Sequence, residues 1–183
     1  MTDRLQLIHG DITTLDDDVI VNAANSSLLG GGGVDGAIHR AAGRELLEFC
    51  RTLGGARTGE VKLSPGFRLK AKVIAHAVGP VWRGGTAGED GQLISCYRRA
   101  LELTVGAGFH TVAFPAISTG VYGFPFERAT RLALATVREA LATEPRLTRV
   151  TLCFFSAEEL ELARQLAAEP TEGPTLRQAS FGF

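Results

Sequence analysis

Apolar residues along this chain fall into two kinds of segment, and the two kinds alternate. One kind is a short, nearly continuous apolar run that ends at turn residues, which is typical of a buried β-strand. Six runs have this pattern: Leu5–His9, Val19–Asn22, Val61–Leu63, Val73–Val78, Thr111–Phe114 and Val150–Phe155. They predict six strands, of which Val61–Leu63 has the weakest pattern.

The other kind of segment has apolar residues three and four positions apart, as on one face of a helix. Four segments have this spacing: Val34 to about Thr52 with a break at Gly43, Leu93–Val105, Pro125–Leu141 and Ala157 to about Ala168. Proline is favourable in the first turn of a helix, as at Pro125. Ser156 can cap the last helix, with Glu159 completing a capping box.

Strands that alternate with helices predict a three-layer α/β/α sandwich with a mixed, mostly parallel central sheet. The length fits one domain over residues 1–168. Residues 169–183 hold two prolines and little periodicity, so they are a tail or a covering segment. In such folds a ligand binds beyond the carboxyl ends of the strands, so a ligand-binding motif is expected to follow a strand.

Charge and composition exclude some classes of protein. The formal net charge is −1, so the chain lacks the strong basic footprint of a nucleic-acid-binding domain. Backbone amides and helix dipoles can still bind a small anion without any excess of lysine or arginine. No apolar run reaches membrane-spanning length and no signal-peptide pattern is present, which predicts a cytoplasmic protein that binds no membrane. The three cysteines have no paired spacing and are expected to be buried, reduced thiols.

The most informative stretch runs from Asn22 to His39. Asn22 and Asn25 follow a strand, four consecutive glycines occupy positions 30–33, and Asp35 and His39 are four residues apart on one face of the predicted helix. Glycine is used where the backbone needs a positive φ or where a ligand approaches it closely. Each asparagine alone is compatible with an ordinary turn, but the combination at a strand's carboxyl end indicates a ligand site.

Two familiar phosphate loops do not match this stretch. A Walker motif needs Gly-Lys-Ser or Gly-Lys-Thr after the glycines, and none follows. A dinucleotide fingerprint needs an acidic residue at a strand end about 20 residues later, whereas Glu45 and Glu48 fall inside a helical pattern. A dinucleotide-dependent oxidoreductase is therefore a poor match.

A second loop joins the strand at Thr111 to the helix at Pro125. Its small residues predict a tight turn whose backbone amides surround a diphosphate, with Tyr122 closing over a sugar. The candidate residues in it are Ser118, Thr119, Gly120, Val121 and Tyr122.

These motifs together resemble the macrodomain family, specifically its MacroD-type ADP-ribosyl hydrolases. The resemblance rests on Gly10-Asp11-Ile12-Thr13, on Val21-Asn22-Ala23-Ala24-Asn25, on Gly31 to His39 and on Gly120-Val121-Tyr122-Gly123. It extends over about residues 5–168. It implies a hydrolase that removes mono-ADP-ribose from acidic side chains of proteins and deacetylates O-acetyl-ADP-ribose, with no cofactor. The implied partners are ADP-ribose, ADP-ribosylated proteins and O-acetyl-ADP-ribose.

The resemblance also implies roles for individual residues. Asn25 would orient the distal ribose, Asp35 would position or activate the attacking water, His39 would support Asp35, and Asn22 would shape the floor of the site. The distal ribose would lie against the backbone of Gly31, Gly32, Gly33 and Val34. Asp11 and the Ile12 backbone would contact the adenine, and Phe155 would pack on its face. Phe154 competes with Phe155 because neighbouring strand residues face opposite ways.

Two further expectations concern chemistry. Asp35 begins a predicted helix, where the dipole favours the charged carboxylate, so its pKa should be depressed and a ligand phosphate oxygen would share the role of proton acceptor. No metal-ligand spacing is visible, so no catalytic metal is expected. Two alternatives stay open: a non-catalytic reader that binds ADP-ribose, and hydrolysis of another linkage, to a nucleic-acid base or a terminal phosphate.

Overall fold

The computed structural model describes residues 3–170 and 181–183. Its central element is a six-stranded sheet with the strand order β1-β6-β5-β2-β4-β3. The strands are β1 Leu5–His9, β2 Val19–Ala24, β3 Val61–Pro65, β4 Val73–Val78, β5 Thr111–Phe114 and β6 Arg149–Phe154. All neighbouring pairs are parallel except β3 with β4, which are antiparallel. The sheet is therefore mixed and mostly parallel, as expected.

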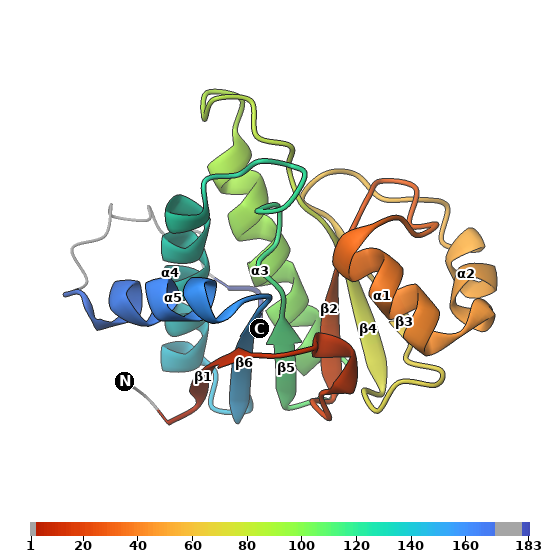
Figure 1. The fold of residues 1–183 in the computed structure, drawn as a ribbon. Coiled ribbons are helices and arrows are strands. Elements are labelled where there is room, and N and C mark those ends of the chain that lie inside the picture. The colour runs from red at the N-terminus through yellow and green to blue at the C-terminus, as the bar shows by residue number, and fades with distance from the viewer. Residues whose placement is uncertain (1–2, 171–180) are drawn as a thin grey trace.

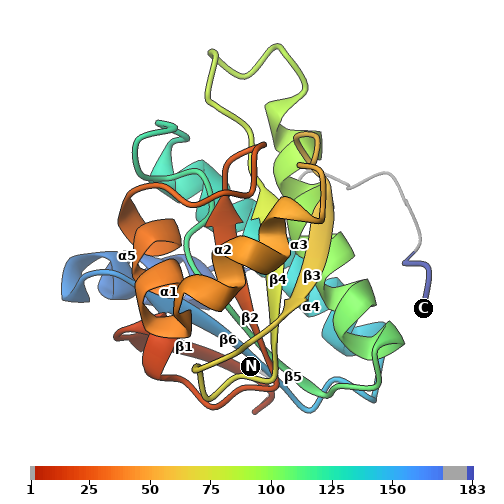
Figure 2. The same cartoon turned by 90° about the vertical axis from the view of Figure 1, so that its right-hand side faces the viewer.

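Helices cover both faces of this sheet (Figure 1). They are α1 Gly33–Ala42, α2 Arg44–Arg51, α3 Glu89–Gly106, α4 Phe126–Thr143 and α5 Ala157–Ala168, with a short 3-10 helix at Ile12–Thr14. Buried residues of α1 and α2 share one apolar cluster with the 3-10 helix. Buried residues of α3, α4 and α5 share the other. Figure 2 shows α1 and α2 in front of the sheet, which confirms the three-layer sandwich.

Most predicted boundaries agree with the structure to within a residue or two. Gly43 separates α1 from α2 through a positive φ of 93°, the break that the sequence indicated. The weak candidate at Val61 is a strand, and its antiparallel pairing continues to Pro65. Pro125 stands at the N-cap of α4, one residue before its first turn.

One cap differs in detail from the prediction. The Ser156 side chain accepts a hydrogen bond from the Glu159 amide at 3.1 Å, as predicted. The Glu159 carboxylate, however, accepts from the Phe155 amide rather than from the cap residue itself. The carboxylate thereby holds the last residue before the cap, at the carboxyl end of β6.

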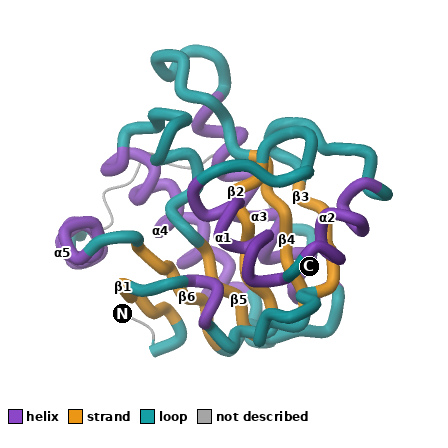
Figure 3. Tube along the Cα trace, turned by 45° about the vertical axis from the view of Figure 1, so that its right-hand side comes forward, coloured by secondary structure: helices purple, strands orange, loops and turns teal. Residues whose placement is uncertain are grey.

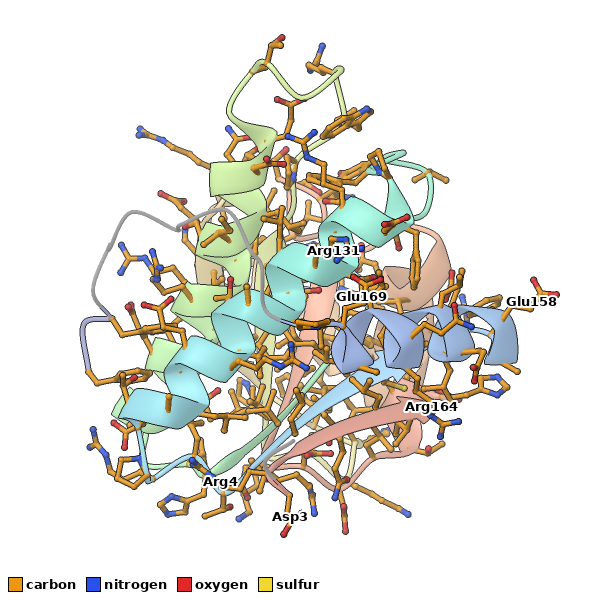
Figure 4. All side chains as sticks on the ribbon, turned by 90° about the vertical axis from the view of Figure 1, so that its left-hand side faces the viewer. Asp3, Arg4, Arg131, Glu158, Arg164 and Glu169 are labelled. Carbon is orange, nitrogen blue, oxygen red and sulfur yellow. The ribbon has the colours of Figure 1, made fainter. Side chains whose placement is uncertain are left out.

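The carboxyl end of the chain contacts the helices of one face. Glu169, just after α5, forms an ion pair with Arg131 of α4 at 2.6 Å (Figure 4). Phe181 packs under the Arg98 guanidinium, 5.0 Å from the ring centroid, and the Gly182 amide donates to Glu102. Whether 169–183 is a tail or a cover lies largely outside the described residues. All three cysteines are buried and unpaired.

Candidate active site

Two loops leave adjacent strands at the same end of the sheet and turn to opposite faces. The loop after β2 leads to α1 on one face, and the loop after β5 leads to α4 on the other. Because β2 and β5 are parallel neighbours, this end of the sheet is a topological switch point, where ligands bind in α/β folds. Figure 3 shows both connections as loops beyond the strand ends.

Asn25 shapes the first loop with its own side chain. Its Oδ1 accepts hydrogen bonds from the Ser27 amide and the Ser27 hydroxyl, at 3.2 and 2.6 Å, and its Nδ2 donates to the Gly30 carbonyl at 3.0 Å. The turn interpretation of this asparagine is thus correct. It leaves one Nδ2 hydrogen for a ligand, since an amide nitrogen carries two.

Gly31 stands between Asn25 and Asp35. A Cβ at this position would lie 3.2 Å from Asp35 Oδ2 and 3.4 Å from Asn25 Nδ2. Any side chain larger than hydrogen would therefore press on the Asp35 carboxylate and touch the Asn25 amide. The glycine serves close approach here and not backbone freedom, because its φ is not positive.

The loop ends in a helix whose first amides lack a side-chain cap. Gly32 is the N-cap residue of α1 and offers no capping group. Among the described residues, the amides of Gly31 to Val34 donate no hydrogen bond outside the helix itself. Free amides at a helix N-terminus are suited to an anion or another acceptor.

Asp35 lies in the first turn of this helix and is only 5% exposed. Its Oδ1 accepts a hydrogen bond from Asn22 Nδ2 at 2.8 Å. Burial raises the pKa of Asp35, and it outweighs the Asn22 hydrogen bond and the nearby His39, which lower it. The expected depression of the Asp35 pKa is therefore wrong: loss of hydration dominates over the groups that lower the pKa.

His39 and Asn22 complete the surroundings of Asp35. His39 Nε2 is 3.5 Å from Asp35 Oδ1, close enough for electrostatic attraction but not aligned as a hydrogen bond. Asn22 belongs to β2 rather than to the loop, because the strand continues to Ala24, and it is fully buried. Its Oδ1 has no hydrogen-bond partner within the described part of the chain. Asn22, Asn25, Asp35 and His39 thus form one cluster.

The second loop also offers unused amides. Gly123 donates to the Gly120 carbonyl and Phe124 to the Ser118 carbonyl, which closes the loop. The amides of Gly120, Val121 and Tyr122 have no acceptor among residues 3–170 and 181–183. Ser118 has a positive φ of 66° despite its side chain, and its buried hydroxyl has no partner in the same residues. Strain of this kind gathers at functional sites.

A third loop, residues 81–88, supports the second and was missed by the sequence reasoning. The Trp82 amide donates to the Tyr122 carbonyl at 2.8 Å, and the Trp82 ring packs against Phe124. The Glu89 carboxylate accepts from the amides of Arg83, Gly85 and Ala87. Burial raises the pKa of Glu89, but these backbone donors outweigh it and lower the pKa to about 2. A first-turn glutamate after a glycine-rich loop was the available signal.

The proposed adenine end lies at the carboxyl ends of β1 and β6. Asp11 Oδ1 accepts from the amide and hydroxyl of Thr13, and Ile12 is buried. Phe155 is 89% exposed, whereas Phe154 is 3% exposed and belongs to the core. Of the two phenylalanines, only Phe155 has an exposed ring.

No group of three or more metal-ligating side chains is found in residues 3–170 and 181–183. Within the same part of the chain, no helix is both long and apolar enough to cross a membrane.

Known proteins are similar to this chain in sequence. The family model described as Macro domain matches residues 21–133. A macro domain-containing protein of Chlorobaculum tepidum is 54% identical, over 90% of this chain and 95% of its own. A protein of Enterobacter cloacae named O-acetyl-ADP-ribose deacetylase is 48% identical, over 92% of this chain and 96% of its own.

Solved structures of macrodomains superimpose on this chain. A mutant of the Oceanobacillus iheyensis macrodomain with ADPR superimposes with a TM-score of 0.85 at 41% identity, covering 88% of this chain and 90% of that one. The Trypanosoma brucei macrodomain in complex with ADP-ribose superimposes with a TM-score of 0.83 at 41% identity, covering 88% and 68%.

Proposed function

Since the chain belongs to the Macro domain family, we propose that it is a hydrolase of acyl esters of ADP-ribose. The ester is that of O-acetyl-ADP-ribose or the one that joins mono-ADP-ribose to an aspartate or glutamate side chain of a protein. Both substrates carry the same bond, an acyl group on a hydroxyl of the distal ribose. One site serves both substrates.

Binding of ADP-ribose uses the two loops and the adenine end. The unused amides at Gly31–Val34 and at Gly120–Tyr122 suit the diphosphate and the distal ribose. The exposed Phe155 ring suits the adenine face, and Asp11 its amino group. A near-neutral chain can bind this dianion because the donors are backbone groups, which add nothing to the net charge.

Hydrolysis needs a water that attacks the acyl carbon while the bond from that carbon to the ribose oxygen breaks. The water's proton passes to a base, the ribose hydroxyl regains a proton, and a carboxylate leaves. Asp35 is the group best suited to orient and deprotonate this water, because burial raises its pKa and makes it a better base than an exposed carboxylate. Asn25 directs its remaining Nδ2 hydrogen at the ribose, and His39 supports Asp35 electrostatically.

The observation that carries this proposal is the Asp35 carboxylate itself. It is buried beside an uncapped helix N-terminus and is separated from Asn25 only by Gly31. A protein that merely binds ADP-ribose needs the amides and the phenylalanine but gains nothing from a buried carboxylate near the ribose, which repels the ligand's diphosphate.

The test measures turnover of O-acetyl-ADP-ribose and of a glutamate-linked mono-ADP-ribosylated protein. The Asp35→Asn variant keeps the shape of the side chain and should lose about 10²–10⁴-fold in kcat on both substrates, while its Kd for ADP-ribose stays close to that of the wild type. Glu48→Gln, which changes an exposed carboxylate on α2, is the matched control and should be fully active.

Two outcomes would count against the proposal. Tight ADP-ribose binding without turnover of either ester would make the protein a reader. Full activity of the Asp35→Asn variant would remove this carboxylate from the chemistry.

A further inference from the structure

A chain of buried polar side chains runs from Asp35 through the sheet, away from the two loops. Asn22 Nδ2 lies 2.8 Å from Asp35 Oδ1 and 3.1 Å from His76 Nδ1. On the other side of the imidazole, His76 Nε2 lies 2.8 Å from Ser64 Oγ. All four residues are at most 5% exposed. They belong to α1, β2, β4 and β3, so this series of side chains crosses three neighbouring strands.

The chemistry of these groups determines the direction of every hydrogen bond. The Asn22 amide nitrogen has two hydrogens and no free lone pair, so both of its neighbours must accept. His76 Nδ1 is therefore unprotonated and its Nε2 carries the hydrogen, which it donates to Ser64. The Ser64 hydroxyl in turn can donate to the Pro65 carbonyl at 3.2 Å. Each donor has an acceptor, and the chain ends on the Asp35 carboxylate.

Burial and the neighbouring His39 favour a neutral His76. The His39 ring is 6.4 Å away, Cys50 Sγ is 3.8 Å from Nε2, and Lys62 stands opposite on β3 with its ammonium bound to the carbonyls of Leu53 and Gly55. Burial and His39 lower the pKa of His76 to about 4. Burial and the charge of Asp35 raise the pKa of Cys50 to about 11. At neutral pH the imidazole is uncharged and the thiol protonated.

The Asp35 carboxylate and an unprotonated His76 Nδ1 both favour this orientation of the Asn22 amide. If the amide were reversed, its oxygen would face both the Asp35 carboxylate and the His76 Nδ1 lone pair, which repel it. Protonation of His76 would instead favour the reversed amide, because Nδ1–H would then need an acceptor. The imidazole thus acts together with the carboxylate in holding a donor toward Asp35, although it does not touch Asp35.

We propose that His76 is a positioning residue for the hydrolysis: it holds the Asn22 amide with its NH2 group toward Asp35. The proposal rests on the proposed role of Asp35. A buried histidine could also serve packing alone, but an apolar ring would fill the same space without the cost of desolvating two ring nitrogens. Polar side chains at these buried positions are explained if the last of them, Asp35, is the carboxylate that acts on water.

Two amide variants separate positioning from packing. The amide of His76→Asn reaches the position of Nδ1 and can still accept from Asn22, but it loses Ser64. The amide of His76→Gln reaches the position of Nε2 and keeps Ser64, but it offers Asn22 no acceptor at Nδ1. His76→Gln should lose about 10–100-fold in kcat with an unchanged Kd for ADP-ribose, as residues that orient a reacting group usually do. His76→Asn should keep most of the activity.

The acid limb of the kcat–pH profile gives a readout that packing would not move. The Asn22 hydrogen bond lowers the Asp35 pKa, so its loss in His76→Gln should raise that pKa and move the acid limb to higher pH. The limb should stay in place in His76→Asn. Equal losses in both variants with an unmoved limb would overturn the proposal and leave His76 a packing residue.

A carbon-13 NMR titration of the Asp35 carboxyl keeps this test independent of turnover. If the wild type hydrolyses neither ester, the proposed function fails, but a higher Asp35 pKa in His76→Gln than in His76→Asn still supports the positioning role. The same pKa in both variants refutes it. If His76→Gln does not fold, Ser64→Ala removes the acceptor of Nε2–H and should raise the Asp35 pKa in the same direction by less; no change would again refute the role.

Discussion

Gly31 offers the sharpest test of where the distal ribose lies. In Gly31→Ala the new methyl carbon would sit 3.2 Å from Asp35 Oδ2 and 3.4 Å from Asn25 Nδ2, so at least one of these groups must move by a few tenths of an ångström. The backbone itself is not strained, because Gly31 is not among the residues with positive φ. The substitution therefore acts on the site and not on the fold.

The expected magnitude follows from the cost of overpacking a filled space, about 1–3 kcal/mol. Converted at about 1.4 kcal/mol for each tenfold, this is a loss of about 5-fold to 150-fold in affinity for a ligand that must share the space. ADP-ribose carries the distal ribose and ADP does not. Gly31→Ala should weaken ADP-ribose by this factor and leave ADP nearly unchanged, as isothermal titration calorimetry of both ligands would measure.

The control is Gly106→Ala, at the end of α3 and outside the two loops. A Cβ at Gly106 meets no atom within 4 Å, and its φ is not positive, so alanine is tolerated and both affinities should stay at the wild-type value. Both variants should remain folded at the assay temperature. Equal weakening of ADP and ADP-ribose by Gly31→Ala, or full retention of both affinities, would refute the placement of the distal ribose against this glycine.

Three further predictions concern the rest of the molecule. Phe155→Ala should leave the melting temperature unchanged, because the ring is 89% exposed, yet should weaken ADP-ribose by about 1–3 kcal/mol if the ring stacks on adenine; equal binding by the variant would show that the ring does not stack. Glu89→Gln removes a carboxylate whose folded pKa of about 2 is below its ordinary value of 4.5. Its stabilising effect is fully present above pH 4.5 and is lost as the pH falls toward 2, so the melting temperatures of Glu89→Gln and the wild type should differ at pH 7 and converge at pH 2; a constant difference would contradict this assignment. Gly91→Ala, at an open position inside α3, should stabilise the protein by up to about 1 kcal/mol through helix propensity alone, measured by urea denaturation, and a loss of stability would reveal a contact of this glycine that the free structure lacks.

The elements of the fold were predictable because their signals are local. A run such as Val73–Val78 and a stripe such as that from Ala129 to Leu141 report directly which residues face the core. Only β3 gave a weak signal, since it lies at the sheet edge and only one of its five residues is buried. The loop cluster was predictable for a similar reason: Asn22, Asp35 and His39 lie within one strand–loop–helix unit.

The supporting residues were not predictable, since their partners are remote in the sequence. His76 is 54 positions from Asn22, and its register opposite Asn22 exists only once β2 pairs with β4. Glu89 was not predictable for a similar reason. An acidic residue at the start of a helix is already explained by that position, so its partners in the preceding loop are not expected from the sequence. Such residues become visible only when the strands are aligned and hydrogen-bond partners are counted.

The error over the Asp35 pKa has a different physical origin. The helix dipole can be inferred from sequence, whereas the loss of hydration depends on how completely Gly31, Asn22 and His39 enclose the carboxylate. Enclosure prevails here and raises the pKa, so Asp35 has less need of a ligand phosphate as a second proton acceptor. The hydrogen bond from Asn22 then matters because it lowers the Asp35 pKa against the effect of desolvation. The orientation of the Asn22 amide depends in part on His76, which does not touch Asp35. Burial thus raises the basicity of the proposed catalytic carboxylate, and the hydrogen bond from the sheet beneath it limits that rise.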